Sequence, residues 1–518
     1  MVAVSACGSS APSAPPLHDN RVGPESMFTS AAELTASPAE AAATIKTLKS
    51  LGVDRVHVPL YWGSLAPDSG SPHKPDFDAT DPAAYPASGW VVYDAIVRDL
   101  KAAGIGIDLD IQPPPPRWAE GKGAPHPASQ TEWKPNAKEF GEFVQALGTR
   151  YSGHYTPPGQ AKPLPRVDFW SIWNEPDLGV HLAPEAIDHS SVEVAPRLYR
   201  AFVDQAWSAL GATGHGHDTI LIGELAPAGI RYGSGVGDFN SMPPLQFLRA
   251  LYCVDQSYKP LTGEAATVRG CPATAAESAK FAAQNPGLFK ASGVAWHPYP
   301  QGLPPNKITP GEPDYTELAA APNLESVLDR MQRLYGSSTK FTLWSTEFGY
   351  QTTPPDPEAG TVTPEKAAYY MNWAEYLTWL DPRQKSFDQY LLTDPSTGYF
   401  ATGLLTAAGA PKPGFDAYRM PLFLPVTSGQ KGQALDVWGC VRPAPDAARA
   451  THKAQSVQIQ FSGGGTAPFK TVQTVPITNI HGYFEVRHAF PSSGDVRLAW
   501  SYPHGPEVYS RTVVITLR

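Results

Sequence analysis

Residues 169–179 read FWSIWNEPDLG, a short run of aromatic and aliphatic residues that passes into a segment with a proline and a glycine. A run of this length and composition is typical of a buried strand, and the proline and glycine mark the point where it emerges. Residues 341–351 read FTLWSTEFGYQ and repeat the pattern. Glu175 and Glu347 therefore each lie at the end of a predicted strand. We expect a fold that brings these two distant strand ends together.

The chain around these two segments alternates short apolar runs with amphipathic helical stretches. The predicted strands lie near 21–27 and at 55–60, 106–111, 167–173, 219–223, 293–296, 341–345 and 386–392. The predicted helices between them include 39–51, 90–103, 136–151, 195–210, 323–335 and 364–380. Eight strands separated by helices predict an α/β fold, a parallel sheet closed into a (β/α)8 TIM barrel over residues 21–425. A doubly wound open sheet is the alternative, but no glycine-rich phosphate loop follows the first strand.

The pattern changes after residue 425. Short segments of alternating polar and apolar residues lie at 456–461, 470–477, 483–488, 495–501 and 508–517. Turns rich in glycine, serine and proline separate them, and no helical pattern lies between them. This arrangement predicts a small all-β sandwich domain over residues 426–518. At the other end, residues 1–20 are rich in alanine, serine and proline and predict a disordered tether.

Composition and charge argue against several classes of protein. The net charge of −9 is spread without a basic stripe, so we expect no nucleic-acid partner. No apolar run reaches the roughly 20 residues that cross a membrane. We find no cofactor motif, and the spacing of the four cysteines predicts no metal site. The oligomeric state is not predictable from these properties.

The cysteines bear on where the protein works. Cys253 and Cys271 flank a short loop and either close it as a disulfide, as would suit an exported protein, or remain reduced thiols. Cys440 is predicted to be a buried free thiol. Residues 4–8, VSACG, resemble the cleavage box of a bacterial lipoprotein signal peptide, without the basic and hydrophobic regions that precede such a box. The sequence allows two alternatives: Cys7 carries a lipid that attaches the protein to a membrane, or Cys7 is an unmodified cysteine in the tail.

The two glutamates carry the predicted chemistry. In eightfold barrels the reactive groups lie where strands end and the following loops begin. Glu175 ends the fourth predicted strand and Glu347 ends the seventh, so both side chains can reach the mouth of one barrel. A pair of carboxylates at one site is what cleavage of a glycosidic bond requires.

The segment Trp173-Asn174-Glu175-Pro176 resembles the Asn-Glu-Pro signature of clan A glycoside hydrolases, and residues 344–349, WSTEFG, resemble the second motif of that clan. The resemblance covers most of residues 21–425. It implies a retaining enzyme in which Glu175 is the general acid/base and Glu347 is the nucleophile. The barrel followed by a β-domain looks most like family 39 and neighbouring members of the clan.

The same resemblance implies three further site residues. His297 and Tyr299, in AWHPY at the end of the sixth predicted strand, lie at i and i+2 and so on one face of that strand. The tyrosine would donate a hydrogen bond to the nucleophile, and Asn174 would bind the sugar 2-hydroxyl. The chain departs from the clan in the second strand, where His57 replaces an arginine that supports the nucleophile. Either His57 or Arg55 could take over that function.

Three other residues are predicted to bind substrate from their positions beside loops or strand ends. Trp62 follows the second strand and Trp118 follows the third, each next to glycine or proline, so both are candidates for stacking on sugar rings. Glu224 ends the fifth strand and could contact a hydroxyl group.

The sequence therefore predicts an exported glycoside hydrolase, secreted or lipid-anchored at the bacterial cell surface, that acts on an oligo- or polysaccharide of plant or microbial origin. The alternative is an inactive carbohydrate-binding or cell-surface protein on the same scaffold. The β-domain either binds glycan or braces the barrel. The sequence does not identify the sugar, the linkage, or whether cleavage is at chain ends or internal.

Overall fold

The computed structural model describes residues 17, 21–125, 132–187 and 190–518. Its larger part is a closed barrel in which β1 pairs with β2 and each strand with the next, until β8 pairs back with β1, all in parallel. The strands are β1 (Glu25–Thr29), β2 (Arg55–Tyr61), β3 (Gly106–Gln112), β4 (Phe169–Ile172), β5 (Thr219–Leu225), β6 (Gly293–Trp296), β7 (Thr342–Ser345) and β8 (Gln384–Tyr390). The predicted (β/α)8 barrel is confirmed.

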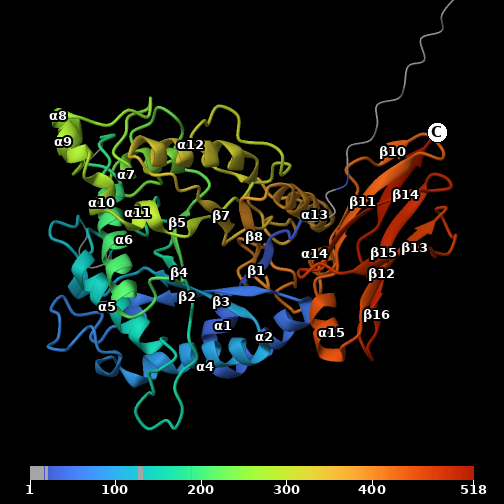
Figure 1. The fold of residues 1–518 in the computed structure, drawn as a ribbon, viewed down its shortest axis with the longest axis horizontal. Coiled ribbons are helices and arrows are strands. Elements are labelled where there is room, and N and C mark those ends of the chain that lie inside the picture. Colours follow the sequence, from blue (N-terminus) through green and yellow to red (C-terminus); the bar gives the residue numbers. More distant parts are fainter. Residues whose placement is uncertain (1–16, 18–20, 126–131, 188–189) are drawn as a thin grey trace, which may run out of the picture.

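Helices surround the barrel on its outer side (Figure 1). They are α1 (Ala31–Ala36), α2 (Pro38–Leu51), α3 (Trp62–Leu65), α4 (Ala87–Ala103), α5 (Ala137–Arg150), α6 (Ala195–Ala212), α7 (Pro244–Leu251), α8 (Gly263–Thr267), α9 (Ala275–Ser278), α10 (Phe281–Gln284), α11 (Gly287–Lys290), α12 (Ala321–Leu334), α13 (Pro364–Leu380) and α14 (Pro413–Arg419), with short 3-10 turns at Pro82–Ala84, Arg117–Ala119 and Leu318–Ala320. The six predicted helices are all present, within three residues at either end.

Helix α2 illustrates why these boundaries were predictable. The Ser37 side chain accepts a hydrogen bond from the Glu40 amide, and Pro38 occupies the first turn, where its missing N–H costs nothing. Gly52 ends the helix in the left-handed conformation, with φ +80°. A side chain there would also collide with the backbone of Arg442.

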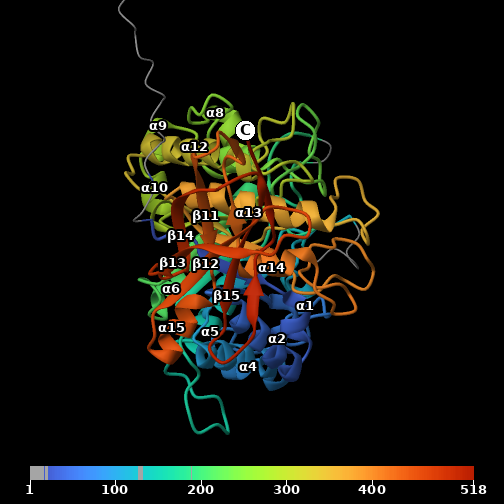
Figure 2. The same cartoon turned by 90° about the vertical axis from the view of Figure 1, so that its right-hand side faces the viewer.

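Two sheets form the second domain, at the right in Figure 1 and facing the viewer in Figure 2. One has the order β10-β17-β15-β12-β13, with β16 beside β15, and the other has the order β14-β11-β9. The elements are β9 (Leu422–Phe423), β10 (Ser428–Gly429), β11 (Ala434–Cys440), α15 (Ala444–Thr451), β12 (Gln455–Ser462), β13 (Lys470–Ile477), β14 (Tyr483–Ala489), β15 (Gly494–Ser501), β16 (Glu507–Tyr509) and β17 (Val513–Leu517). Both sheets contribute to one apolar core, so the predicted sandwich is present.

The sequence missed five features of this domain. Strands β9, β10 and β11 were not predicted, the segment 508–517 is two strands, and helix α15 lies where no helical pattern was found. Two-residue strands carry no periodicity that a sequence can reveal. Because β9 pairs with β11, the chain enters the sandwich before residue 426.

The sandwich is fastened to the barrel through helix α13. Trp379 of that helix packs in one cluster with Phe423 and Trp438 of the three-stranded sheet. Beside it the buried carboxylate of Glu375 accepts hydrogen bonds from Arg442 at 2.6 Å and from the Tyr483 hydroxyl at 2.8 Å. Removing one partner from a buried ion pair costs about 3–5 kcal/mol. These contacts favour bracing as the role of the second domain.

The cysteine predictions have mixed outcomes. Cys253 and Cys271 form a disulfide, and Cys440 is a buried free thiol. Cys7 and nearly all of the predicted tether lie outside the described residues. Among the residues that the structure describes, no helix has the length and apolar character needed to cross a bilayer.

Candidate active site

A cavity of about 990 Å³ opens where the barrel strands end. Loops that follow six of the eight strands contribute to its wall, as expected for the functional end of such a barrel. Its lining includes Thr29, Tyr61, Gln112, Pro113, Glu132, Asn174, Glu175, His181, Ala226, Tyr299, Gln301, Glu347, Tyr350, Gln351, Glu358, Tyr390 and Phe400. Four of the sequence-predicted site residues are in this wall: Asn174, Glu175, Tyr299 and Glu347.

Glu175 and Glu347 meet in this cavity although they come from different strands. One oxygen of each carboxylate and one ring nitrogen of His297 all lie within 4.8 Å of one another. In retaining glycosidases the two carboxyl groups are about 5–5.5 Å apart, whereas inverting enzymes hold them at about 6.5–9.5 Å to admit a water molecule. The approach of these two oxygens to within 4.8 Å is compatible with the shorter spacing.

The imidazole of His297 links three carboxylates. Its Nδ1 lies 2.8 Å from Glu175 Oε1 and 3.6 Å from Glu347 Oε2, and its Nε2 lies 3.0 Å from Glu224 Oε2. Burial disfavours the charged ring, but the surrounding carboxylates outweigh it and raise the pKa of His297 well above its usual range. His297 is therefore an imidazolium that donates from both nitrogens.

Glu347 is almost fully buried and accepts a hydrogen bond of 2.9 Å from the Tyr299 hydroxyl. Burial raises its pKa to about 7, and repulsion from Glu175 adds to this effect. The charges of His297 and His57 and the Tyr299 hydroxyl act in the opposite direction. Tyr299 and the two imidazoles thus favour the ionised form of Glu347, whereas desolvation of its carboxylate opposes that form.

The backbone around Glu175 is unusual. Trp173 has φ +66° and Glu175 has φ +42°, values that residues with a side chain rarely adopt. The Glu175 amide donates to the Glu224 carbonyl at 2.9 Å, which ties the end of β4 to β5. Strain of this kind is concentrated at functional sites, where surrounding contacts hold it in place. Here it directs the Glu175 carboxylate toward His297 and into the cavity.

Asn174 also lines the cavity, next to Glu175. It is 7% exposed, and its Oδ1 has no hydrogen-bond partner within the described part of the chain. A buried amide oxygen without a partner is costly unless a ligand satisfies it. The position suits the predicted contact with a sugar hydroxyl.

The structure does not support direct substrate contact by four predicted residues. Glu224 and His57 are both 0% exposed and lie inside the barrel, where His57 pairs with Asp108. Trp62 is also 0% exposed, because it stacks on Phe143 between the barrel and its helices. Trp118 donates its indole N–H to the Pro67 carbonyl and packs edge-on against Trp62, outside the cavity wall. None of these four side chains is part of the cavity wall.

Arg55 is not part of the cavity wall either. It begins β2, and so lies at the end of the barrel opposite the cavity. There it pairs with Glu25 at 2.8 Å and covers the Phe169 ring. His57, two residues further along the strand, is the one that comes within electrostatic reach of Glu347.

Sequence reasoning missed Tyr390 and Phe400, two aromatic residues that line the cavity beside Tyr299. Tyr299, Tyr390 and Phe400 form an edge-to-face group with centroids 5.5–6.1 Å apart. Phe400 is 37% exposed and sits on the loop after β8, so its ring is accessible from the cavity. Tyrosine at a strand end and phenylalanine in a loop carry no sequence signal that separates them from core residues.

His181 was also missed. It lies in the loop after β4, lines the cavity and places its Nδ1 3.6 Å from Glu175 Oε2. Burial lowers the pKa of His181, so the ring is neutral where His297 is charged. Only its nearness to Glu175 in the sequence could have suggested it.

Two groups place possible metal ligands close together: Glu175 with His297 and Glu347, and His57 with Asp108 and Glu224. In both groups a ring nitrogen lies 2.8 Å from a carboxylate oxygen. That separation is a charge-assisted hydrogen bond, and each contact requires a proton on the nitrogen. A metal would need the same nitrogen deprotonated.

The chain has only distant similarity to known proteins. No model of a known protein family and no curated protein matches the chain. Solved structures with some likeness include an endo-beta-1,4-mannanase from Thermotoga petrophila, at 11% identity over 96% of this chain and 99% of that one, with a TM-score of 0.41. A glycoside hydrolase family 5 structure from Bacteroides vulgatus has 11% identity, 95% and 89% coverage and a TM-score of 0.41. A family 1 b-glucosidase from Thermotoga maritima has 16% identity, 71% and 81% coverage and a TM-score of 0.43. These neighbours are glycoside hydrolases by name, at similarities too low to assign an activity to this chain.

Proposed function

We propose that this protein is a retaining glycoside hydrolase in which Glu347 is the nucleophile and Glu175 is the general acid/base. The observation that carries the proposal is the carboxylate pair, whose oxygens lie within 4.8 Å across a cavity at the functional end of the barrel. The hydroxyl of Tyr299 and the imidazolium of His297 favour the ionised form of Glu347. That charge state is the one a nucleophile needs.

The reaction follows from these positions. The Glu347 carboxylate attacks the anomeric carbon while the Glu175 carboxylic acid gives its proton to the departing glycosidic oxygen. This step forms an ester between the sugar and Glu347 and neutralises the Glu347 charge. Glu175, now ionised, removes a proton from water, which attacks the anomeric carbon and releases Glu347. The Oδ1 of Asn174, unsatisfied among the described residues, accepts a hydrogen bond from a sugar hydroxyl during both steps.

The protein is proposed to act outside the cytoplasm, secreted or held at the bacterial surface. The Cys253–Cys271 disulfide supports export, since such bonds persist in oxidising compartments. We propose further that a lipid attached to Cys7 holds the protein at the membrane surface. Mass spectrometry of the mature protein from membrane and medium fractions tests it.

The stereochemistry of the product tests the reaction. The purified protein is offered a panel of aryl glycosides and plant and bacterial cell-wall polysaccharides. For any substrate cleaved, proton NMR in the first minutes is expected to show the product with the same anomeric configuration as the substrate. Inversion would contradict the double displacement. Tight binding of a glycan without any hydrolysis would instead favour the inactive carbohydrate-binding protein.

The charge of the cavity predicts the class of sugar. Its wall contains the carboxylates Glu132, Glu175, Glu347 and Glu358, and no lysine or arginine among the described residues. Residues 1–16, 18–20, 126–131 and 188–189, which the structure does not describe, contain no lysine or arginine in their sequence. Acidic sugars normally require such cations for binding, and carboxylates in a cleft repel them. We therefore expect a neutral or amino sugar as substrate.

A matched pair of substrates tests this expectation. The aryl glycoside of the sugar that is cleaved best is compared with its uronic acid counterpart, which differs in one carboxylate. The neutral substrate is expected to have a kcat/KM at least about fivefold higher at low salt, because like charges at short range repel by about 1 kcal/mol or more. Glu358→Gln, which removes an exposed charge, should narrow the difference. Equal rates on both substrates would contradict the electrostatic selection.

A further inference from the structure

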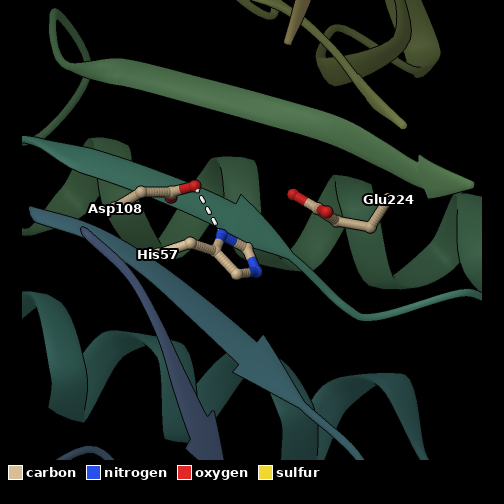
Figure 3. A group of neighbouring side chains, drawn as sticks. All are labelled: His57, Asp108 and Glu224. Atoms are coloured by element: carbon tan, nitrogen blue, oxygen red, sulfur yellow. Dashed lines mark hydrogen bonds and ion pairs between the residues drawn. The ribbon is translucent and has the colours of Figure 1, made fainter. Parts of the chain in front are cut away.

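The barrel interior below the cavity holds a second imidazole that the proposed reaction does not use. His57 on β2 is 0% exposed, and so are Asp108 and Asp110 on β3, which is its neighbour in the sheet. Figure 3 shows His57 and Asp108 in contact, with the Glu224 carboxylate directed toward them from β5. Ligand atoms of these three residues all lie within 4.8 Å of one another.

Each nitrogen of His57 faces a carboxylate. Nδ1 lies 2.8 Å from Asp108 Oδ2, and Nε2 lies 3.4 Å from Asp110 Oδ2. The Nδ1 contact is a hydrogen bond, whereas Nε2 has no hydrogen-bond partner among the described residues and meets Asp110 only at ion-pair distance. Because Glu224 is also close, buried carboxylates surround the ring and favour its imidazolium form. Burial disfavours that charge, but Asp108 and Asp110 outweigh it and raise the pKa of His57 well above its usual range. The surrounding carboxylates thus favour the charged form of the His57 ring.

This cation is connected to the catalytic carboxylates. Glu224 lies between the two imidazoles: it is near His57 on one side and accepts a hydrogen bond of 3.0 Å from His297 on the other. Thr346 Oγ1 also donates to Glu224, at 2.5 Å. Although burial opposes ionisation, His297 and His57 together lower the pKa of Glu224. Ionised Glu224 in turn keeps His297 charged beside Glu175 and Glu347.

Several charged or titratable groups face His57 from the strands around it. They are Asp108 and Asp110 on β3, Glu224 on β5, Glu347 after β7, Asp388 on β8 and Tyr61 on its own strand. Burial raises the pKa of Asp388 well above its usual range and so favours the uncharged form of this carboxyl. Among the described groups that face Glu347, the cations are His57 and His297.

We propose that His57 is a positioning residue whose permanent buried charge keeps Glu347 ionised, directly through space and indirectly through Glu224 and His297. The inference rests on the proposed function, because it concerns the nucleophile of that reaction. His57 does not touch substrate. It acts from beneath the site, beside Asp108 and Asp110.

Kinetics against pH test the proposal through His57→Gln, a neutral residue of similar size. In the wild type, kcat/KM should rise with pH through about 7 as Glu347 loses its proton. Loss of the cation raises the pKa of Glu347, so this limb should move upward by about one unit. Such a shift lowers kcat/KM about tenfold at pH 6 but only about twofold at pH 8. A residue that only filled space would lower activity equally at both pH values.

A matched control is available in His215. This histidine is also 0% exposed, with Nδ1 2.6 Å from Asp218 and Nε2 2.9 Å from the Gly148 carbonyl. It precedes β5 and therefore lies at the opposite end of the barrel from the cavity. His215→Gln removes a buried imidazole in the same way and should leave the pH limb where it is. An equal shift in both variants, or none in His57→Gln, would overturn the proposal.

The charge of His57 can be measured without activity. Nitrogen NMR of histidine-labelled wild-type protein should show the His57 ring doubly protonated at pH 8, with signals that vanish in His57→Gln. If that variant does not fold, Asp108→Asn serves for assignment, since it keeps the ring and shifts its signals. A neutral His57 ring at pH 8 would refute the inference. Absence of hydrolysis on every glycan would instead refute the proposed function and leave the charge measurement standing.

Discussion

Replacement of Glu347 by alanine is expected to lower hydrolysis of every substrate by about 10⁴-fold or more, because no glycosyl-enzyme can then form. The loss should not depend on the leaving group, since the missing group attacks the sugar and not the departing oxygen. Initial rates on two aryl glycosides of different leaving-group acidity, and on the natural glycan, measure it. The kcat should fall in every case.

A carboxylate on the same cavity wall provides the control. Glu358 is exposed and lines the cavity, and Glu358→Ala should lose less than about tenfold on a neutral substrate. A fluoro-sugar that traps the glycosyl-enzyme should label the wild-type peptide containing Glu347. Labelling of the peptide that contains Glu175 or Glu224 would assign the nucleophile elsewhere and overturn these roles.

Replacement of Glu175 by alanine is expected to have an effect that depends on the leaving group. A glycoside with a poor leaving group needs the acid and should lose about 10²–10⁴-fold in kcat/KM. A dinitrophenyl glycoside departs without protonation, so its first step should be nearly unchanged. Its second step lacks the general base, and a burst of dinitrophenol followed by a slow steady state should appear in stopped-flow measurements.

Added azide distinguishes this role from simple damage to the site. Azide attacks the anomeric carbon without needing a general base, so it should restore turnover of the dinitrophenyl glycoside by Glu175→Ala and yield a glycosyl azide of retained configuration. Glu347→Ala provides the contrast, because it forms no intermediate for azide to intercept. Equal losses on good and poor leaving groups, with no azide rescue, would contradict the assignment of Glu175 as acid/base.

Much of the barrel could be predicted because its signals are local. Helix α2 has a serine cap, a proline in the first turn and a glycine at its end, and β2 is a short apolar run. Such signals involve only a few consecutive residues, so they can be recognised without knowing which other elements pack against them. Strands β9 and β10 have only two residues each, so their existence depends on pairing with partners elsewhere in the chain.

The same division applies to the site. Glu175 and Glu347 were identified because each follows a buried strand within a recognisable motif. Trp62 was misplaced, since the turn that follows β2 rotates its ring toward Phe143 and away from the cavity. Phe400 escaped notice because a loop far along the chain brings it against Tyr299 and Tyr390.

Local pattern therefore accounts for the elements, their order and the two reactive groups, because hydrophobic period, caps and strand-end motifs are written in consecutive residues. The charge states of side chains inside the barrel are not determined by consecutive residues. Whether His57, Glu224 and His297 form a connected line of alternating charge depends on the register of β2 against β3 and of β5 against β6. Burial and close approach set those charges, and both arise only when strands distant in the sequence are packed side by side.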